Sequence, residues 1–302
     1  MIAEAKAGTA LAAALQDAAA RLARAGIETA RLDAEVLMAE AAGVARTALA
    51  AGAARPDAGA LARFEAMVAR RAAREPLAYV VGHREFFSLD FEVNPAVLIP
   101  RPETETVVEC ALDFLSGRAE ASVLDLGTGS GAIAVAIAVN APQARVVATD
   151  ISEVSLEVAQ RNARSHRCAD RIRFVAGDCY GALEHGWDGG PFDLIVSNPP
   201  YVAEAEADTL APEVREFEPR AALVGGPDPL VFYRRIASGL ERWLHCRGEV
   251  IVEVGAGQAR AVARIFETAG CVNFAIVRDL AGVERVVRAR RAGGNVEPSR
   301  AA

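Results

Sequence analysis

The sequence predicts an α/β protein in which a small helical domain precedes a doubly wound sheet. Three observations lead to this fold class. Residues 1–75 are helical in period and composition, with Gly and Pro as punctuation. From residue 122 onward, short apolar segments alternate with helical ones. The chain has 302 residues, enough for about two domains at roughly 100 to 200 residues each.

Composition limits the classes of protein that fit. Hydrophobic residues make up 52% of the chain and charged residues 24%, which allows a sizeable core and argues against a disordered polymer. The net charge of −7 argues against direct nucleic-acid binding, because neutralising phosphates takes clustered Lys and Arg. The scattered cysteines form no C-x-x-C pair, and the alanine-rich N-terminus carries an early Glu4. We therefore expect a cytoplasmic monomer with no membrane contact.

The first domain is predicted to span residues 1–83. Two helices, over about residues 9–25 and 29–42, stop at Gly26 and Gly43, which suit left-handed C-terminal caps. A third helix starts near Pro56 and ends before Pro76. Three arginines near its C-terminus match the helix dipole and are expected to face solvent: Arg70, Arg71 and Arg74.

A hairpin and a connector are predicted over residues 84–104. Residues 84–93 alternate apolar and polar positions around a turn-like Ser88, as a short hairpin would. The stretch LIPRPETE at 98–105 contains two prolines, which block regular structure. Two roles stay open for this connector: closing over a site or only linking the domains.

The second domain is predicted to span residues 105–291. Five segments are apolar at nearly every residue, as parallel strands covered on both faces must be: 123–126, 145–149, 172–176, 192–197 and 250–254. Helices fit between them at 132–139, 153–165, 229–244 and 259–269. The last segments, 272–277 and 285–288, are too close together for a helical crossover and should pair antiparallel. Residues 292–302 have nothing to bury and are expected to be disordered.

A cofactor turn is predicted where the first strand meets its helix, in the sequence DLGTGSG at 125–131. In an open α/β sheet a ligand reaches this edge, and glycines let it approach the backbone closely. Asp150 ends the second strand, where its carboxylate can accept hydrogen bonds from ribose hydroxyls. Asp178 and Cys179 follow the third strand, where an adenine would lie.

The chemistry of this turn favours S-adenosyl-L-methionine over NAD. The glycine spacing is G-x-G-x-G rather than G-x-G-x-x-G, and Asp125 precedes it. A carboxylate there would repel a pyrophosphate but suit a cationic sulfonium ligand. The four histidines show no metal-ligand spacing, so we expect no metal. The predicted cofactor-binding residues are Gly127, Thr128, Gly129, Ser130, Gly131, Asp150, Asp178, Cys179 and Asn198.

The fourth strand ends in Asn198-Pro199-Pro200-Tyr201, next to the predicted cofactor turn. These four residues are the predicted substrate-binding set, and Asn198, Pro199 and Tyr201 the catalytic one. A planar NH₂ group fits them, because the Asn198 side-chain oxygen and the Pro199 carbonyl could each accept one hydrogen while Tyr201 packs on the conjugated face. Holding this weak nucleophile in line with a methyl group can supply much of the barrier reduction without a strong base.

Several motifs together resemble the HemK/PrmC family of protein-(glutamine-N5) methyltransferases. The matching positions are PLAY at 76–79, Gly82, EF at 85–86, IPRPETE at 99–105, DLGTGSG at 125–131, NPPY at 198–201, EPRAAL at 218–223 and EVG at 253–255. The resemblance covers roughly residues 10–290 and implies a seven-stranded, Rossmann-like methyltransferase domain behind a helical substrate-recognition domain. It also implies the substrate, the glutamine of the GGQ motif in class I peptide chain release factors.

Two other functions stay open at this stage. NPPY alone also occurs in adenine-N6 methyltransferases, so adenine in DNA or RNA is an alternative acceptor. The acidic composition and the lack of a basic, aromatic-rich segment argue against it. A non-catalytic cofactor-binding module is a third reading, and the intact acceptors at Asn198 and Pro199 argue against that one.

Overall fold

The computed structural model describes residues 2–292 except positions 52, 54, 185 and 186, and it forms two compact units. The first comprises Met1–His83 together with Ala211–Phe217, and the second Arg84–Leu210 and Glu218–Ala302. The sequence pattern does not predict that a segment at 211–217 joins the helical unit. Of the tail expected to be disordered, residues 293–302 lie outside the described part of the chain, and the Ala292 N–H donates to the Gly270 carbonyl at 3.2 Å.

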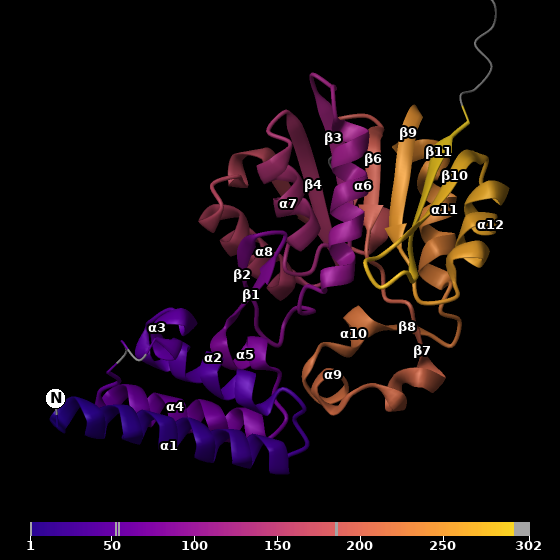
Figure 1. Cartoon of the computed structure of the whole chain (residues 1–302). Helices are drawn as coiled ribbons and strands as arrows, with labels where there is room; N and C mark the ends of the chain where they lie inside the picture. Colours follow the sequence, from indigo (N-terminus) through magenta and orange to yellow (C-terminus); the bar gives the residue numbers. More distant parts are fainter. Residues whose placement is uncertain (1, 52, 54, 185–186, 293–302) are drawn as a thin grey trace, which may run out of the picture. The chain divides into compact units, whose positions relative to one another are not determined.

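The first unit is helical throughout its described elements (Figure 1). These are α1 (Ile2–Arg24), α2 (Ala30–Ala42), α3 (Arg46–Ala50), α4 (Ala58–Ala72), α5 (Leu77–Val81) and α9 (Pro212–Phe217). The three long helices predicted for residues 1–75 are confirmed, and Gly43 caps α2 in the left-handed conformation. The short α3 and α5 were not predicted. Leu22, Leu37 and Phe64 form part of the buried core of this unit.

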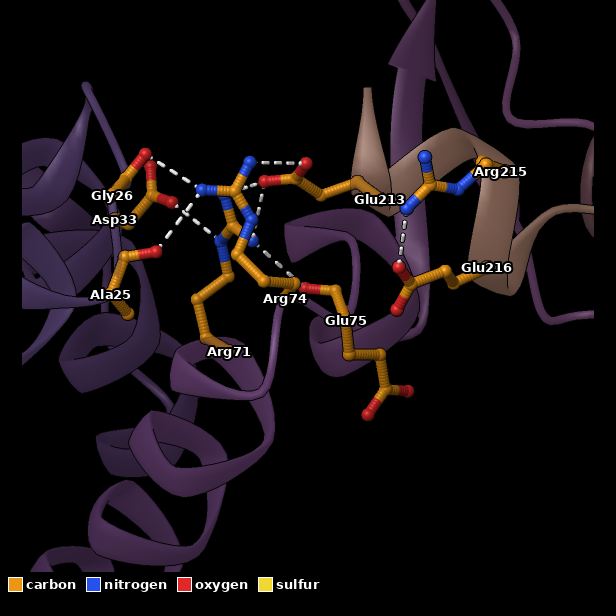
Figure 2. A network of polar contacts seen from close by, with 9 residues as sticks. All are labelled: Ala25, Gly26, Asp33, Arg71, Arg74, Glu75, Glu213, Arg215 and Glu216. Atoms are coloured by element: carbon orange, nitrogen blue, oxygen red, sulfur yellow. Dashed lines mark hydrogen bonds and ion pairs between the residues drawn. The ribbon is translucent and has the colours of Figure 1, made fainter. Parts of the chain in front are cut away.

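The arginines at the end of α4 correct one expectation. Arg71 is only 7% exposed, and its Nε donates to Asp33 Oδ2 at 2.8 Å. Its guanidinium also donates to Glu213 of α9 at 3.2 Å, and Arg74 donates to the same carboxylate at 2.6 Å (Figure 2). The expectation that all three arginines face solvent was therefore wrong for Arg71. Helix periodicity could not reveal a carboxylate that arrives from a distant part of the sequence.

The predicted hairpin is confirmed as β1 (His83–Phe86) paired with β2 (Leu89–Glu92). Its turn residues Phe87 and Ser88 have φ of 51° and 59°, which matches the two left-handed positions of a type I′ turn. The connector contains a short 3₁₀ helix, η1 (Pro102–Thr104), where irregular structure was expected. It runs directly into α6 (Glu105–Leu115), a helix that was not predicted.

The second unit is built on a seven-stranded sheet with the order β10-β11-β9-β6-β3-β4-β5. The strands are β3 (Ala121–Leu126), β4 (Ala144–Asp150), β5 (Ile172–Ala176), β6 (Phe192–Ser197), β9 (Leu244–Glu253), β10 (Cys271–Arg278) and β11 (Glu284–Arg291). β3, β4, β5, β6 and β9 are parallel, and β10 and β11 pair antiparallel, as predicted. β11 also pairs antiparallel with β9, which was not predicted. The expectation of full burial was wrong for β5, which lies at the edge and buries only Ile172 fully.

Helices cover both faces of this sheet (Figure 1). Alternate strand residues belong to different clusters: Val123 packs with α6 and α7 (Ala132–Asn140), whereas Leu124 packs with α11 (Val231–Trp243) and α12 (Ala259–Thr268). The helix α8 (Glu153–Ser165) matches its predicted bounds. Among the described helices, none is both long and apolar enough to cross a bilayer.

The remaining elements are short and lie in the loops of the second unit. Two-residue β7 (Val202–Ala203) pairs in parallel with β8 (Val224–Gly226), which follows α10 (Arg220–Leu223). Three 3₁₀ helices complete the described elements: η2 (Ala169–Arg171), η3 (Cys179–Leu183) and η4 (Glu204–Thr209).

Candidate active site

A cavity of about 460 Å³ lies at the carboxyl ends of β3, β4, β5 and β6. Its size falls in the range of small-molecule sites. β3 has β4 on one side and β6 on the other, so the chain reverses its order across the sheet at this point. Such a topological switch point is where open α/β sheets bind ligands.

The glycine turn after β3 forms one wall. Gly127 and Gly129 both have left-handed backbones, with φ of 74° and 55°, and a Cβ at either position would meet nothing within 4 Å. Both line the cavity, so the turn leaves open space against its backbone. Gly131 serves a different purpose, because a Cβ there would stand 3.0 Å from Ala159 Cβ of α8, and it does not line the cavity.

Asp150 lines the cavity at the end of β4. Its Oδ2 accepts from the Gly129 N–H and its Oδ1 from the Ser152 N–H, each at 2.9 Å. Burial raises the pKa of this carboxyl, and the two backbone hydrogen bonds offset part of that rise. Since a carboxylate offers about four acceptor positions, Asp150 can fix the turn and still accept hydrogen bonds from a ligand.

Asp125 lies beneath the turn and does not line the cavity. Its Oδ2 accepts from Thr128 Oγ1 at 2.6 Å, and its Oδ1 has no hydrogen-bond partner among the described residues. Burial, opposed by the Thr128 hydrogen bond, raises the pKa of this carboxyl to about 7. Asp125 therefore holds the turn through Thr128 and does not face the cavity, whereas the sequence placed its carboxylate beside the ligand.

The predicted adenine-side residues both line the cavity. Asp178 is half exposed, and its Oδ1 lies 2.6 Å from Arg235 Nη2 of α11. Cys179 has a left-handed backbone with φ of 54°, and burial raises the pKa of its thiol. Thr128 and Ser130 of the turn complete the set of predicted cofactor residues found at the cavity wall.

The loop after β6 brings Asn198, Pro199 and Pro200 to the same cavity. Tyr201 is placed differently from the expectation that its ring forms a wall for the substrate. It does not line the cavity; its ring packs against the core cluster of α11 and α12, and its hydroxyl donates to Glu253 Oε1 at 3.2 Å. Gln258 Nε2 donates to the Tyr201 carbonyl at 3.0 Å, which anchors the end of the loop.

The connector is the part of the site that the sequence analysis left open. Its residues Val97, Leu98, Pro100, Arg101 and Thr104 line the cavity, so the connector is a wall of the site. Glu218, 5% exposed, holds it by accepting from Arg101 Nη2 at 2.5 Å and from the Ile99 N–H at 3.1 Å. The two prolines signalled irregular structure, but no spacing marks Arg101 or Thr104 as site residues.

Comparisons with known proteins match both parts of the chain. A family model described as the PrmC N-terminal domain matches residues 13–82, and one described as the methyltransferase small domain matches residues 106–217. A protein of Burkholderia pseudomallei named release factor glutamine methyltransferase is 46% identical over 267 residues, covering 87% of this chain and 92% of its own length. One of the same name from Geobacter sulfurreducens is 44% identical, covering 89% and 92%.

A solved structure supports the fold. The hMettl16 catalytic domain in complex with MAT2A 3'UTR hairpin 6 is 17% identical and has a TM-score of 0.56, with 77% of this chain and 84% of that chain covered. At this identity the similarity concerns the arrangement of helices and strands. It agrees with the mixed seven-stranded sheet described above.

Proposed function

Because the chain belongs to the release factor glutamine methyltransferase family, we propose that it methylates the N5 side-chain amide of the glutamine in the GGQ motif of class I peptide chain release factors. The proposed methyl donor is S-adenosyl-L-methionine. One observation carries the proposal: the Asn198-Pro199-Pro200 loop and the open glycine turn line a single cavity.

The residues present fit the proposed donor. The open backbone at Gly127 and Gly129 leaves room for a ligand that packs closely on the turn. Asp150 has acceptor positions left for ribose hydroxyls, and Cys179 offers a small apolar contact for an adenine. When bound, S-adenosyl-L-methionine supplies a methyl group on a positively charged sulfur, which an amide nitrogen can attack.

The acceptor loop is suited to a primary amide. Asn198 Oδ1 and the Pro199 carbonyl can each accept one hydrogen of the NH₂ group, as proposed from the sequence. Proline limits the backbone freedom of the loop, and Gly225 of β8 closes on it so tightly that a Cβ there would lie 2.7 Å from the Pro200 oxygen. The loop that carries the acceptors is therefore packed closely against β8.

Positioning is the main contribution that these residues can make. An amide nitrogen is a weak nucleophile because its lone pair is delocalised. Holding the nitrogen in line with the methyl group can lower the barrier by about 7 to 11 kcal/mol in well-oriented systems. The nitrogen becomes acidic as the new N–C bond forms, so its proton can leave without a strong base.

We infer that the protein works in the cytoplasm as a monomer, in translation termination. Its proposed substrate is a translation factor, and its buried cysteines Cys110, Cys168 and Cys271 are free thiols, which suits a reducing compartment. The helical unit is the proposed recognition domain for the release factor. The match of residues 13–82 to the PrmC N-terminal domain supports this assignment.

A labelling assay tests the proposed function. The purified protein is incubated with methyl-labelled S-adenosyl-L-methionine and either a wild-type release factor or one whose GGQ motif is changed to GGA. The wild-type factor should take up label and the GGA factor should not. Equal labelling of both factors, or label that appears only in added DNA or RNA, would contradict the proposal.

A further inference from the structure

Glu253 is a buried carboxylate whose hydrogen-bond partners are two hydroxyl groups. It ends β9, is 1% exposed and does not line the cavity. Its Oε2 accepts from Thr104 Oγ1 at 2.5 Å, and its Oε1 accepts from Tyr201 Oη at 3.2 Å. These partners come from the connector and from the loop after β6, so one side chain holds both walls of the site.

Asn198 is the next residue in this series of hydrogen bonds. A hydroxyl has a single hydrogen, so Thr104, which donates to Glu253, can only accept on its other side. It accepts from Asn198 Nδ2 at 3.1 Å. The amide of Asn198 is then fixed with its NH₂ toward Thr104, and its Oδ1 remains as the acceptor for a substrate.

We propose, on the basis of the proposed function, that Glu253 is a positioning residue that sets the orientation of the Asn198 amide through Thr104. The oxygen and the NH₂ group of an amide are nearly equivalent in shape, so without these hydrogen bonds the Asn198 amide could take either orientation. In the wrong orientation its NH₂ group would present donors where a substrate NH₂ needs an acceptor. Glu253 thereby selects the amide orientation that can bind the substrate.

The surroundings of Glu253 suit this role better than that of an ion pair. Two charged side chains act on it with opposite signs, Glu103 and Arg285, and the Arg285 Nε pairs with Asp279 Oδ2 at 3.2 Å. Burial raises the pKa of Glu253, and the hydrogen bonds from Thr104 and Tyr201 oppose that rise. The two hydroxyls thus stabilise the ionised form of Glu253. In that form both of its oxygens accept, so Thr104 must donate to Glu253 and accept from Asn198.

The first experiment compares Thr104→Val with Thr104→Ser. Val keeps the shape and removes the hydroxyl, so turnover on the release factor should fall about tenfold or more, whereas Ser should restore most of it. Binding of S-adenosyl-L-methionine should change little in both variants. The thermal midpoint of Thr104→Val should fall, because the buried Glu253 carboxylate loses a donor, so turnover is measured well below that midpoint. Thr106→Val is the matched control, because Thr106 is also buried and lies outside the cavity lining. Wild-type turnover in Thr104→Val would overturn the proposal.

A double-mutant cycle separates positioning from general damage. If Thr104 acts through the Asn198 amide, Thr104→Val should add nothing to the loss caused by Asn198→Ala. Glu253→Gln should likewise add nothing in the Asn198→Ala background. Losses that multiply would overturn the proposal, because they would show that Thr104 and Glu253 act by separate routes.

A third measurement does not depend on any substrate. In the NMR spectrum of the full chain, the Asn198 side-chain NH₂ signals are identified by their loss in Asn198→Ala. In the wild type they should exchange with water slowly, and in Thr104→Val about tenfold faster, since the partner that holds them is gone. Unchanged exchange would overturn the proposal. Wild-type protein that fails to label a release factor would instead overturn only the proposed function.

Discussion

Two glutamates, one in each compact unit, join segments that are far apart in the sequence, and their hydrogen-bond partners differ in charge. Glu213 accepts hydrogen bonds from the guanidinium groups of Arg71 and Arg74 (Figure 2). Glu253 accepts from two neutral hydroxyls. Burial would raise the pKa of both carboxyls; for Glu213 its own backbone N–H and the two arginines reverse the shift and lower it, whereas the pKa of Glu253 stays raised.

This difference separates two uses of a carboxylate, one half-buried and one fully buried. Paired with arginines, Glu213 is balanced in charge, so we expect it to stabilise the docking of α9 on the helical unit. Glu253, whose side chain is bonded to hydroxyls, costs stability when it is ionised, because its pKa is raised, and we expect it to matter for turnover instead. Each expectation can be tested by removing one partner.

The largest effect is expected for Arg71→Met. Arg71 lies between the carboxylates of Asp33 and Glu213, and its removal leaves both without their shared counter-ion. The free energy of unfolding should fall by about 3 to 5 kcal/mol, measured by urea denaturation. The matched control is Arg31→Met, since the Arg31 side chain is 89% exposed and should cost less than about 0.5 kcal/mol. Equal losses in the two variants would show that the contacts of Arg71 with Asp33 and Glu213 do not stabilise the fold.

The next largest effect is expected at Asn198, the residue that Glu253 is proposed to position through Thr104. Asn198→Ala removes an oriented acceptor, so turnover should fall by about a hundredfold or more while cofactor binding stays nearly intact. Single-turnover labelling of the release factor, with calorimetry of cofactor binding, measures the two effects separately. A variant with unchanged turnover would remove Asn198 from its proposed role.

Asp150 is a third case, because the donors to its carboxylate are backbone N–H groups and not arginines or hydroxyls. Asp150→Ala should weaken binding of S-adenosyl-L-methionine by about thirtyfold, since lost hydrogen bonds to a charged group cost about 2 kcal/mol. Titration calorimetry measures this. Wild-type affinity in the variant would count against the ribose contact.

The same substitution at the two glutamates gives the sharpest contrast. Glu213→Gln should lower stability by about 1.5 kcal/mol and leave turnover intact, since it weakens charge-assisted hydrogen bonds of a residue that does not line the cavity. Glu253→Gln should lower turnover about tenfold with stability unchanged or increased. Stability and turnover that fall together in both variants would remove the distinction.

The smallest effect is a difference in pH dependence with opposite signs. Glu213 has a lowered pKa, so its contribution to stability is present above the ordinary value of 4.5 and is lost as pH falls through the lowered one. Glu253 has a raised pKa, so its contribution is present below 4.5 and is lost as pH rises through the raised value. With increasing pH, the wild type should therefore gain stability over Glu213→Gln and lose it relative to Glu253→Gln. The free energy of unfolding of the wild type and of each variant is measured against pH. If the wild-type-minus-variant difference changed in the same direction for Glu213→Gln and Glu253→Gln, these assignments would be contradicted.

The sequence was sufficient for most of the second unit because local pattern and burial agree there. The helix at Glu153–Ser165 and the hairpin around Phe87 and Ser88 follow from periodicity and turn position. Burial of β5 was overestimated, because an apolar strand gives no sign of whether it lies at the edge of a sheet. The two prolines before Glu105 predict irregular structure and give no sign that a helix, Glu105–Leu115, begins directly after them.

The residues of the candidate site were predictable only at the ends of predicted strands. Asp150 is the last residue of its strand, Gly127 and Asn198 directly follow theirs, and parallel strands bring such positions to one edge of the sheet. Thr104 and Glu253 lie in two separate stretches of the family resemblance, 149 positions apart, and nothing in either stretch indicates that the two side chains meet. Arg71 and Glu213, 142 positions apart, were unpredictable for the same reason.

The most direct test of the central claim is a crystal structure of the protein with S-adenosyl-L-homocysteine and a peptide containing the GGQ motif. The glutamine NH₂ should donate to Asn198 Oδ1 and to the Pro199 carbonyl, with its nitrogen facing the sulfur. An amide bound elsewhere in the cavity, or an Asn198 whose NH₂ end faces the peptide, would contradict this account.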